Sequence, residues 1–272
     1  MLVSRHSLAR LRPMKTLSAL SYLDVADPGF STRGPEVAAA RAEHWAARTP
    51  YGMAVLRYRE MGQMLRDRRF RQGSHNWPDV HGLTGSFARF WKNSVIGHEG
   101  DAHRTLRTLC VPALSPDFIA QMRPAFAEIA QTLCADLRPH TACEFQNAFA
   151  NPFAGQAITT LLGMDRRDWQ DVSHDATELG LAMGVQSKTH EARFNAACTR
   201  LQDLARDLVA RVRKGRDQTS YVARLVARHR DLPDLDEQAL LDMIVISIFG
   251  GVDTTRAQLG LGLGLFIEHP DQ

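Results

Sequence analysis

The sequence is short of cysteine, of aromatic residues and of lysine. Its four cysteines include no C-x-x-C pair, so a disulfide framework is not expected in a chain of 272 residues. Only four of its 33 basic residues are lysine, which we attribute mainly to the base composition of the gene. The net charge of +3 is too small to indicate a nucleic-acid partner. These shortages predict a globular protein with reduced, buried thiols.

Long uncharged apolar runs are also absent. No segment reaches the roughly 18–20 residues that a membrane-spanning helix needs, and the nearest, Met243 to Val252, lies between two aspartates. Residues 1–20 are basic but have no apolar run or A-x-A cleavage site. We interpret them as disordered or as a misassigned start before Met14. We therefore expect a cytoplasmic protein that makes no membrane contact.

Several common motifs for nucleotides, nucleophiles and metals are missing. Neither G-K-[ST] nor G-x-S-x-G occurs, and Gly260, Gly262 and Gly264 alternate with leucine and do not form G-x-G-x-x-G. His98 and His103 are five residues apart, so they do not form the H-E-x-x-H motif. No dinucleotide site and no metal site made of side chains is predicted.

Apolar residues recur at helical spacing through most of the chain. Met53 to Tyr58 follows a turn and is the best strand candidate, and residues 72–85 are predicted to form a loop. The sequence therefore predicts a mainly α fold with a small β element, as one domain over residues 21–272. The predicted helices are 35–48, 59–67, 101–109, 116–133, 145–162, 165–183, 190–212, 221–229 and 236–268.

Helix ends can be read at several positions. Asp101 is a plausible N-cap, and Pro112 is expected to end that helix. Ser115 followed by Pro116 is typical of a capped helix start. The last predicted helix, from Asp236, would have about 33 residues and a length of roughly 50 Å, enough to cross the whole molecule.

That last helix is interrupted by unusual chemistry at Gly250, Gly251, Asp253 and Thr254. Each glycine costs about 1 kcal/mol relative to alanine within a helix, so two together need a reason. One reason is close approach of a flat ligand to the backbone. The Thr254 hydroxyl is placed to bond the Gly250 carbonyl and to open a kink or π-bulge, and burial would raise the pKa of Asp253. Together they suggest a proton relay. The alternative is a helix crossing with small residues for packing and Asp253 at the surface.

His103 and Arg107 form a second candidate constellation. They are four residues apart, so on a helix both side chains can reach one anionic ligand. The alternative is a solvated basic face without a ligand.

Taken in order, these features resemble a cytochrome P-450 of the soluble bacterial type, a haem-thiolate monooxygenase. The segment from Asp101 to Arg107 is similar to the family's H-x-x-x-R helix, and Gly250 to Thr255 resembles its oxygen-binding groove. Residues 113–116, 149–163 and 267–271 match further parts of the family in the same order. The resemblance begins near residue 20 and covers nearly all of the rest.

The resemblance implies haem b as cofactor, bound through its propionates by His103 and Arg107. Gly250 and Gly251 would lie over the distal haem face, and Thr254 with Asp253 would deliver protons for oxygen activation. Residues 72–90 and 179–189 would line a pocket for a small organic substrate. A ferredoxin-type protein would donate electrons.

The family's E-x-x-R motif and its haem-ligand cysteine loop do not occur in these 272 residues. The sequence therefore resembles about the first two-thirds of a cytochrome P-450 chain. No cysteine is predicted to be the axial ligand, so this polypeptide alone is expected to form no thiolate-ligated haem and to be inactive and poorly stable, with apolar surface exposed. The alternative is a non-catalytic helical protein that acts as a binding or interaction module. The four cysteines are Cys110, Cys134, Cys143 and Cys198.

Overall fold

The computed structural model describes residues 17–138, 142–184 and 186–272. The prediction for residues 1–20 therefore lies mostly outside the described residues. Contacts divide the chain into two compact units, residues 1–71 and 72–272.

The first unit is a small α/β structure. Helix α1 (Pro35–Glu43) is followed by strands β1 (Ala46–Thr49) and β2 (Gly52–Val55), which pair antiparallel, and by helix α2 (Tyr58–Met64). Strand β2 confirms the predicted β element. The predicted helix over residues 35–48 was too long, because its last residues pair with β2 and become β1.

The second unit is helical and contains all the candidate site residues. Its main helices are α3 (Trp77–Val80), α4 (Gly85–Asn93), α5 (Gly100–Ala113), α6 (Pro116–Leu137), α7 (Asn151–Leu161), α8 (Trp169–Gly180), α9 (Glu191–Arg213), α10 (Tyr221–His229) and α11 (Glu237–Glu268). A π-helical turn, Gln146–Ala150, precedes α7. Short 3-10 turns occur at Ser74–Asn76, Arg166–Asp168, Leu181–Met183 and Ser187–His190. Helices α3 and α4 stand where a loop was predicted or no element was expected.

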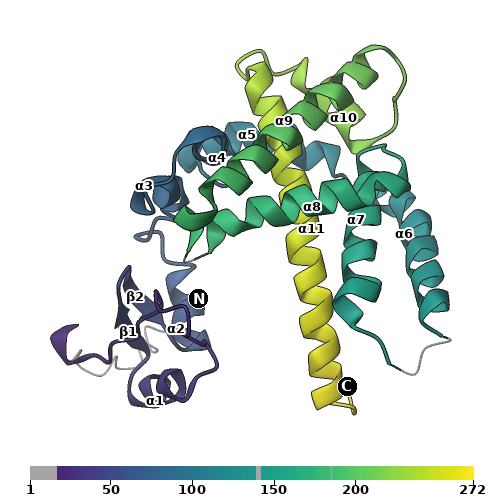
Figure 1. The fold of residues 1–272 in the computed structure, drawn as a ribbon. Helices are drawn as coiled ribbons and strands as arrows, with labels where there is room; N and C mark the ends of the chain where they lie inside the picture. The colour runs from purple at the N-terminus through teal and green to yellow at the C-terminus, as the bar shows by residue number, and fades with distance from the viewer. Residues whose placement is uncertain (1–16, 139–141, 185) are drawn as a thin grey trace, which may run out of the picture. The chain divides into compact units, whose positions relative to one another are not determined.

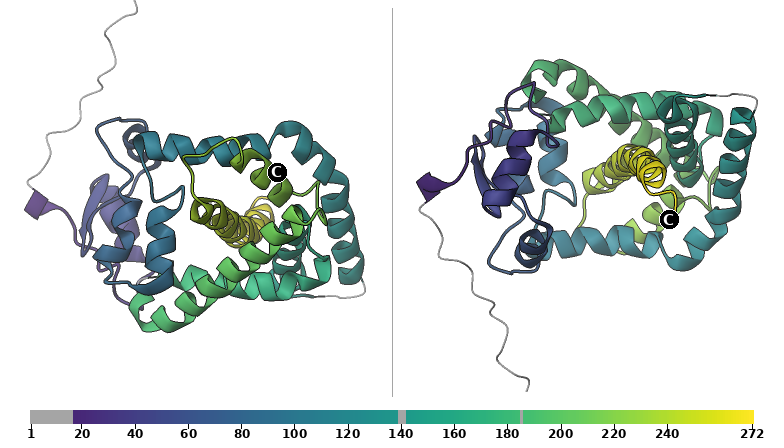
Figure 2. Two further views of the ribbon diagram at one scale, coloured as in Figure 1. Left: turned by 90° about the horizontal axis from the view of Figure 1, so that it is seen from above. Right: turned by 90° about the horizontal axis from the view of Figure 1, so that it is seen from below.

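Helix α11 is the central element of this unit. Seen along its length, it lies among the other helices of the unit (Figure 2), and α8 crosses it near its middle (Figure 1). One buried core joins α11 to α4, α5, α7, α8, α9 and α10. The 32-residue helix is α-helical throughout, so the predicted π-bulge at Thr254 was wrong, and the kink stays a prediction.

Capping explains where several of these helices begin. The Ser115 hydroxyl accepts a hydrogen bond from the Phe118 amide at 3.4 Å, and the Asp236 carboxylate accepts one from the Ala239 amide at 2.8 Å. Both starts confirm the predictions. Asp101 is not a cap, because Glu99 occupies the N-cap of α5. Pro112 lies within the last turn of α5, where the helix continues for one further residue.

Two expectations about apolar surface and thiols need revision. By length and composition α11 could cross a membrane, and half of its most apolar window is buried within the protein. Only Cys198 is buried among the four cysteines, and Cys134 and Cys143 are exposed. The prediction of uniformly buried thiols was therefore wrong.

Candidate functional site

One face of α11 is open at Gly250. This glycine is exposed although the helix before it is buried, and a Cβ added there would meet no atom within 4 Å. Thr254, one turn later, is also exposed, and its hydroxyl donates to the Gly250 carbonyl. The predicted hydrogen bond is confirmed. The backbone at Gly250 therefore offers a flat surface beside a hydroxyl.

Gly251, unlike Gly250, lies against another helix. A Cβ built on this residue would lie 2.7 Å from Cδ1 of Ile158, which is buried on α7. Such a distance is too short for two carbons, so glycine permits the close approach of α7 and α11. The packing explanation accounts for Gly251, and its contact with a cofactor stays a prediction.

Asp253 lies beside Thr254 but is not a buried acid. Its side chain is 40% exposed and forms a 2.6 Å ion pair with Arg256, so the expected apolar setting was wrong. Arg256 also donates to the Thr177 hydroxyl of α8 at 3.0 Å. The acid is therefore held by a guanidinium that also contacts a neighbouring helix.

His103 and Arg107 occupy successive turns of α5, as predicted. His103 is half-buried and Arg107 is exposed. Arg104, between them, pairs with Asp101, whereas no salt bridge is found for Arg107 within the described residues. Because Leu106 on α5 and Val252 on α11 belong to the same buried core, the two helices that carry the predicted site residues pack into one body. The contacts found do not link His103 or Arg107 to Gly250 directly.

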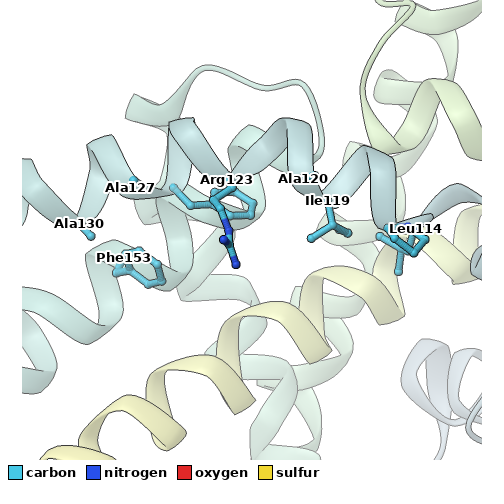
Figure 3. Close-up of a pocket in the computed structure, with 9 residues that line it drawn as sticks. Leu114, Ile119, Ala120, Arg123, Ala127, Ala130 and Phe153 are labelled. Atoms are coloured by element: carbon cyan, nitrogen blue, oxygen red, sulfur yellow. The ribbon is translucent and has the colours of Figure 1, made fainter.

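A cavity of 410 Å³ adjoins the open face of α11 and is lined by Thr254, Thr255, Gln258 and Leu259. A larger apolar cavity of 770 Å³ lies along α6 and includes Phe153 of α7, with Arg123 projecting into it (Figure 3). This larger cavity contains none of the predicted site residues. Size alone therefore does not locate the site, and the chemistry at Thr254 favours the smaller cavity.

The donor set fits a flat, anionic ligand better than a bare metal ion. No group of three or more His, Cys, Asp or Glu side chains that could hold a metal occurs within the described residues. A planar ring could lie on the backbone at Gly250, where a side chain would fill the space. The guanidinium of Arg107 is suited to a carboxylate at the rim of such a ring.

Comparison with known proteins gives a consistent assignment. No family model matches the chain. The chain is 32% identical to the luteothin monooxygenase of Streptomyces thioluteus, over 93% of this chain and 62% of that protein. It is 27% identical to a Mycobacterium tuberculosis protein named as cytochrome P-450 141, over 80% of this chain and 53% of that protein. The chain thus spans less than two-thirds of the length of these relatives.

The fold comparison agrees. The solved structure of cytochrome P-450 CYP109Q5 from Chondromyces apiculatus superposes with a TM-score of 0.75 at 22% identity, covering 93% of this chain and 63% of the other. The helical fold and the sequence relatives both point to the bacterial cytochromes P-450. The chain belongs to the cytochrome P-450 family.

Sequence reasoning missed two residues beside the site. Arg256 could have been found, because an acid and an arginine three positions apart share one face of a helix. Thr177 could not, because nothing in the sequence indicates that α8 crosses α11 at this point. The role of Ile158 opposite Gly251 was hidden for the same reason.

Proposed function

We propose that the protein is the oxygen- and proton-handling part of a haem-dependent monooxygenase that hydroxylates a small organic substrate. The observation that carries this proposal is the open backbone at Gly250, one turn before Thr254 and next to Asp253. Membership of the family supports it. Haem b, when bound, would supply the iron centre at which dioxygen is reduced.

The residues of α11 and α5 would do separate work. Gly250 would let the ring lie against the helix, while His103 and Arg107 would bind its propionates. Thr254 donates to a backbone carbonyl, so the lone pairs of its oxygen stay available to accept a hydrogen bond on the open face. Asp253 would supply the proton, and the Thr254 oxygen would accept the hydrogen bond that orients the proton-bearing group or water.

The partners follow from the same proposal. Electrons would come from a ferredoxin-type donor, and the substrate would be enclosed by residues 72–90 and 179–189. Half of the most apolar window of α11 is buried, which supports a cytoplasmic protein without membrane contact. None of the contacts in the described residues favours the non-catalytic binding module.

Haem titration, followed at the Soret band, tests the proposal. We expect the wild-type chain to bind haem and Gly250→Leu to weaken binding at least tenfold, because the new side chain occupies the ring position. Gly262→Leu is the matched control, since a Cβ at Gly262 also meets no atom within 4 Å. Absence of binding by the wild type, or equal losses in both variants, would contradict the proposal.

The propionate contacts have their own control. Arg107→Ala should weaken haem binding, whereas Arg104→Ala should not, because Arg104 already pairs with Asp101. The spectrum of the reduced, carbon monoxide-bound protein then reports the axial ligand. A thiolate-type Soret band from this chain would overturn the expectation that none of its cysteines is that ligand.

A further inference from the structure

Helix α8 lies directly against the acid of the proposed site. A Cβ built on Gly180 would stand 3.7 Å from the Phe249 ring and 4.0 Å from Oδ1 of Asp253. One carboxylate oxygen of Asp253 therefore faces the backbone of α8. The next question is what fixes the carboxylate in that orientation.

Arg256 makes three hydrogen bonds at this crossing. Its Nε and Nη2 donate to Oδ1 of Asp253 at 3.2 and 2.6 Å, and its Nη1 donates to the Thr177 hydroxyl at 3.0 Å. Thr177 in turn donates its single proton to the Ser173 carbonyl at 2.7 Å. The direction of every bond is thus determined, because the Thr177 oxygen can only accept from Arg256.

The two oxygens of Asp253 are consequently unlike. Oδ1 accepts both bonds from Arg256, while no hydrogen bond is found for Oδ2 in the described part of the chain. A carboxylate held by one oxygen keeps the other available to exchange a proton. Such an arrangement suits an acid that must be positioned without being neutralised by a fully bidentate partner.

An ordinary surface ion pair is the alternative explanation. Exposed pairs contribute about 0–1 kcal/mol and commonly do nothing specific. The Arg206–Asp203 pair of α9 has the same three-residue spacing and is such a pair, with side chains 51% and 63% exposed. Arg256 is only 23% exposed and has a third partner on another helix. Arg206 and Asp203 thus form a local pair within one helix. Arg256, in contrast, joins α11 to α8 through Asp253 and Thr177, and we call this set of contacts the helix bridge.

We propose that Arg256 is a positioning residue, which fixes Asp253 through Oδ1 and couples it to α8 through Thr177. This inference rests on the proposed function, because it assigns the fixed acid to proton delivery. The contacts of Arg256 are with Asp253 and Thr177, so its role is exerted through the acid. Its effect is to hold the carboxylate of Asp253 against α8, with Oδ2 left for exchange with Thr254 or with water.

The bridge also links the acid to the segment that is predicted to enclose the substrate. Residues 179–189 follow Thr177 along the chain. Helix α8 is joined to α9 by two ion pairs, Glu178–Arg193 and Asp175–Arg200, each at 2.6 Å. A shift of α8 relative to α11 would change the contact between Thr177 and Arg256.

The bridge can be tested in the chain without haem by a double-mutant cycle in thermal unfolding. We expect Thr177→Val to lower the midpoint when Arg256 is present and to have almost no effect in an Arg256→Gln background. Thr177→Ser, which keeps the hydroxyl, should behave like the wild type. Additive midpoint shifts for Thr177→Val and Arg256→Gln would overturn the bridge.

The catalytic consequence is read in a haem-loaded protein whose chain is completed by a relative's segment with the E-x-x-R motif and the ligand cysteine, because residues 1–272 contain neither. An electron donor is added, and the readout is the share of consumed oxygen that is released as hydrogen peroxide. We expect that share to rise several-fold in Arg256→Gln, to rise less in Thr177→Val, and to stay unchanged in Thr177→Ser. Arg206→Gln is the control ion pair and should change nothing. An unchanged share in Arg256→Gln would refute the positioning role.

These outcomes keep the two proposals apart. A completed, haem-loaded wild type that consumes no oxygen would overturn the proposed function, and with it the catalytic part of this inference. The helix bridge would then be tested only by the double-mutant cycle in thermal unfolding. Oxygen consumption with an unchanged peroxide share would instead leave the function intact and remove Arg256 from it.

Discussion

The two halves of α11 are similar in composition and opposite in environment. Between Leu240 and Ile248 nearly every side chain is buried, including Ile244 with no exposed surface. Between Leu261 and Ile267 the apolar side chains are 36–73% exposed. The apolar side chains of the first half belong to the main buried core of the unit, whereas those between Leu261 and Ile267 do not. Both halves are therefore apolar and helical, but only the half that other helices cover is part of the core.

The sharpest test of this difference compares two isoleucines of the same helix. Ile244→Ala should lower the free energy of unfolding by about 2–5 kcal/mol, because it removes buried methyl groups and leaves a cavity. Ile267→Ala should change it by no more than about 0.5 kcal/mol, because that side chain is 73% exposed. Urea unfolding of both variants measures the contrast. Similar losses would mean that the second half of α11 is packed as firmly as the first.

A second contrast concerns the two acids of α11, since Asp242 is buried whereas Asp253 is partly exposed. Burial raises the pKa of Asp242 to about 6 from 3.8, although Gln238 and Gln202 donate to its Oδ1, and nearby Asp236 adds to the increase. Its Oδ2 is buried without a partner among the described residues. This carboxyl group therefore holds its proton more tightly in the folded state than in the unfolded chain.

The sign of the pH effect follows from that difference. Below pH 3.8 the group is protonated in both states, and as pH rises toward 6 only the unfolded state loses the proton. Folding stability should fall over this window by roughly 3 kcal/mol, and the penalty persists at neutral pH. Asp242→Asn should remove this part of the pH dependence. We expect the stability difference between variant and wild type to grow by that amount between pH 3.5 and 7.5.

Glu237 supplies a control of opposite sign. Its ion pair with Arg213 lowers the pKa of this carboxyl, so its contribution is present above the unfolded pKa and is lost as pH falls. Glu237→Gln should therefore cost stability at pH 7 and little at pH 3. If Asp242→Asn shows the same sign as Glu237→Gln, Asp242 is not held in its protonated form by burial.

The sequence was a good guide where the signal was local. The boundaries of α10, the start of α11 after Asp236, the cap at Ser115 and the hydrogen bond from Thr254 to Gly250 follow from short-range rules, and all are confirmed. Strand β1 was missed because only its pairing with β2 distinguishes it from the end of a helix.

The candidate site shows the same division. Spacing placed His103 and Arg107 on one face and Gly250 beside Thr254, because these relations lie within single helices. It could not assign Gly251 to its contact with Ile158, nor Arg256 to Thr177, since both depend on where two distant helices cross. The sequence also predicted an apolar setting for Asp253, whereas its side chain is 40% exposed and pairs with Arg256.

The smallest expected effect uses glycines from the two halves of α11. Gly262→Ala should stabilise the protein by about 0.5–1 kcal/mol, because its Cβ meets nothing within 4 Å and alanine favours the helix. Gly251→Ala has the same propensity gain, but its Cβ would lie 2.7 Å from Ile158, so repacking should cancel or exceed that gain. Midpoints of thermal unfolding should therefore move apart. Equal stabilisation by both substitutions would show that α7 yields freely at this crossing, and would remove the packing explanation for one of the two glycines beside the proposed oxygen site.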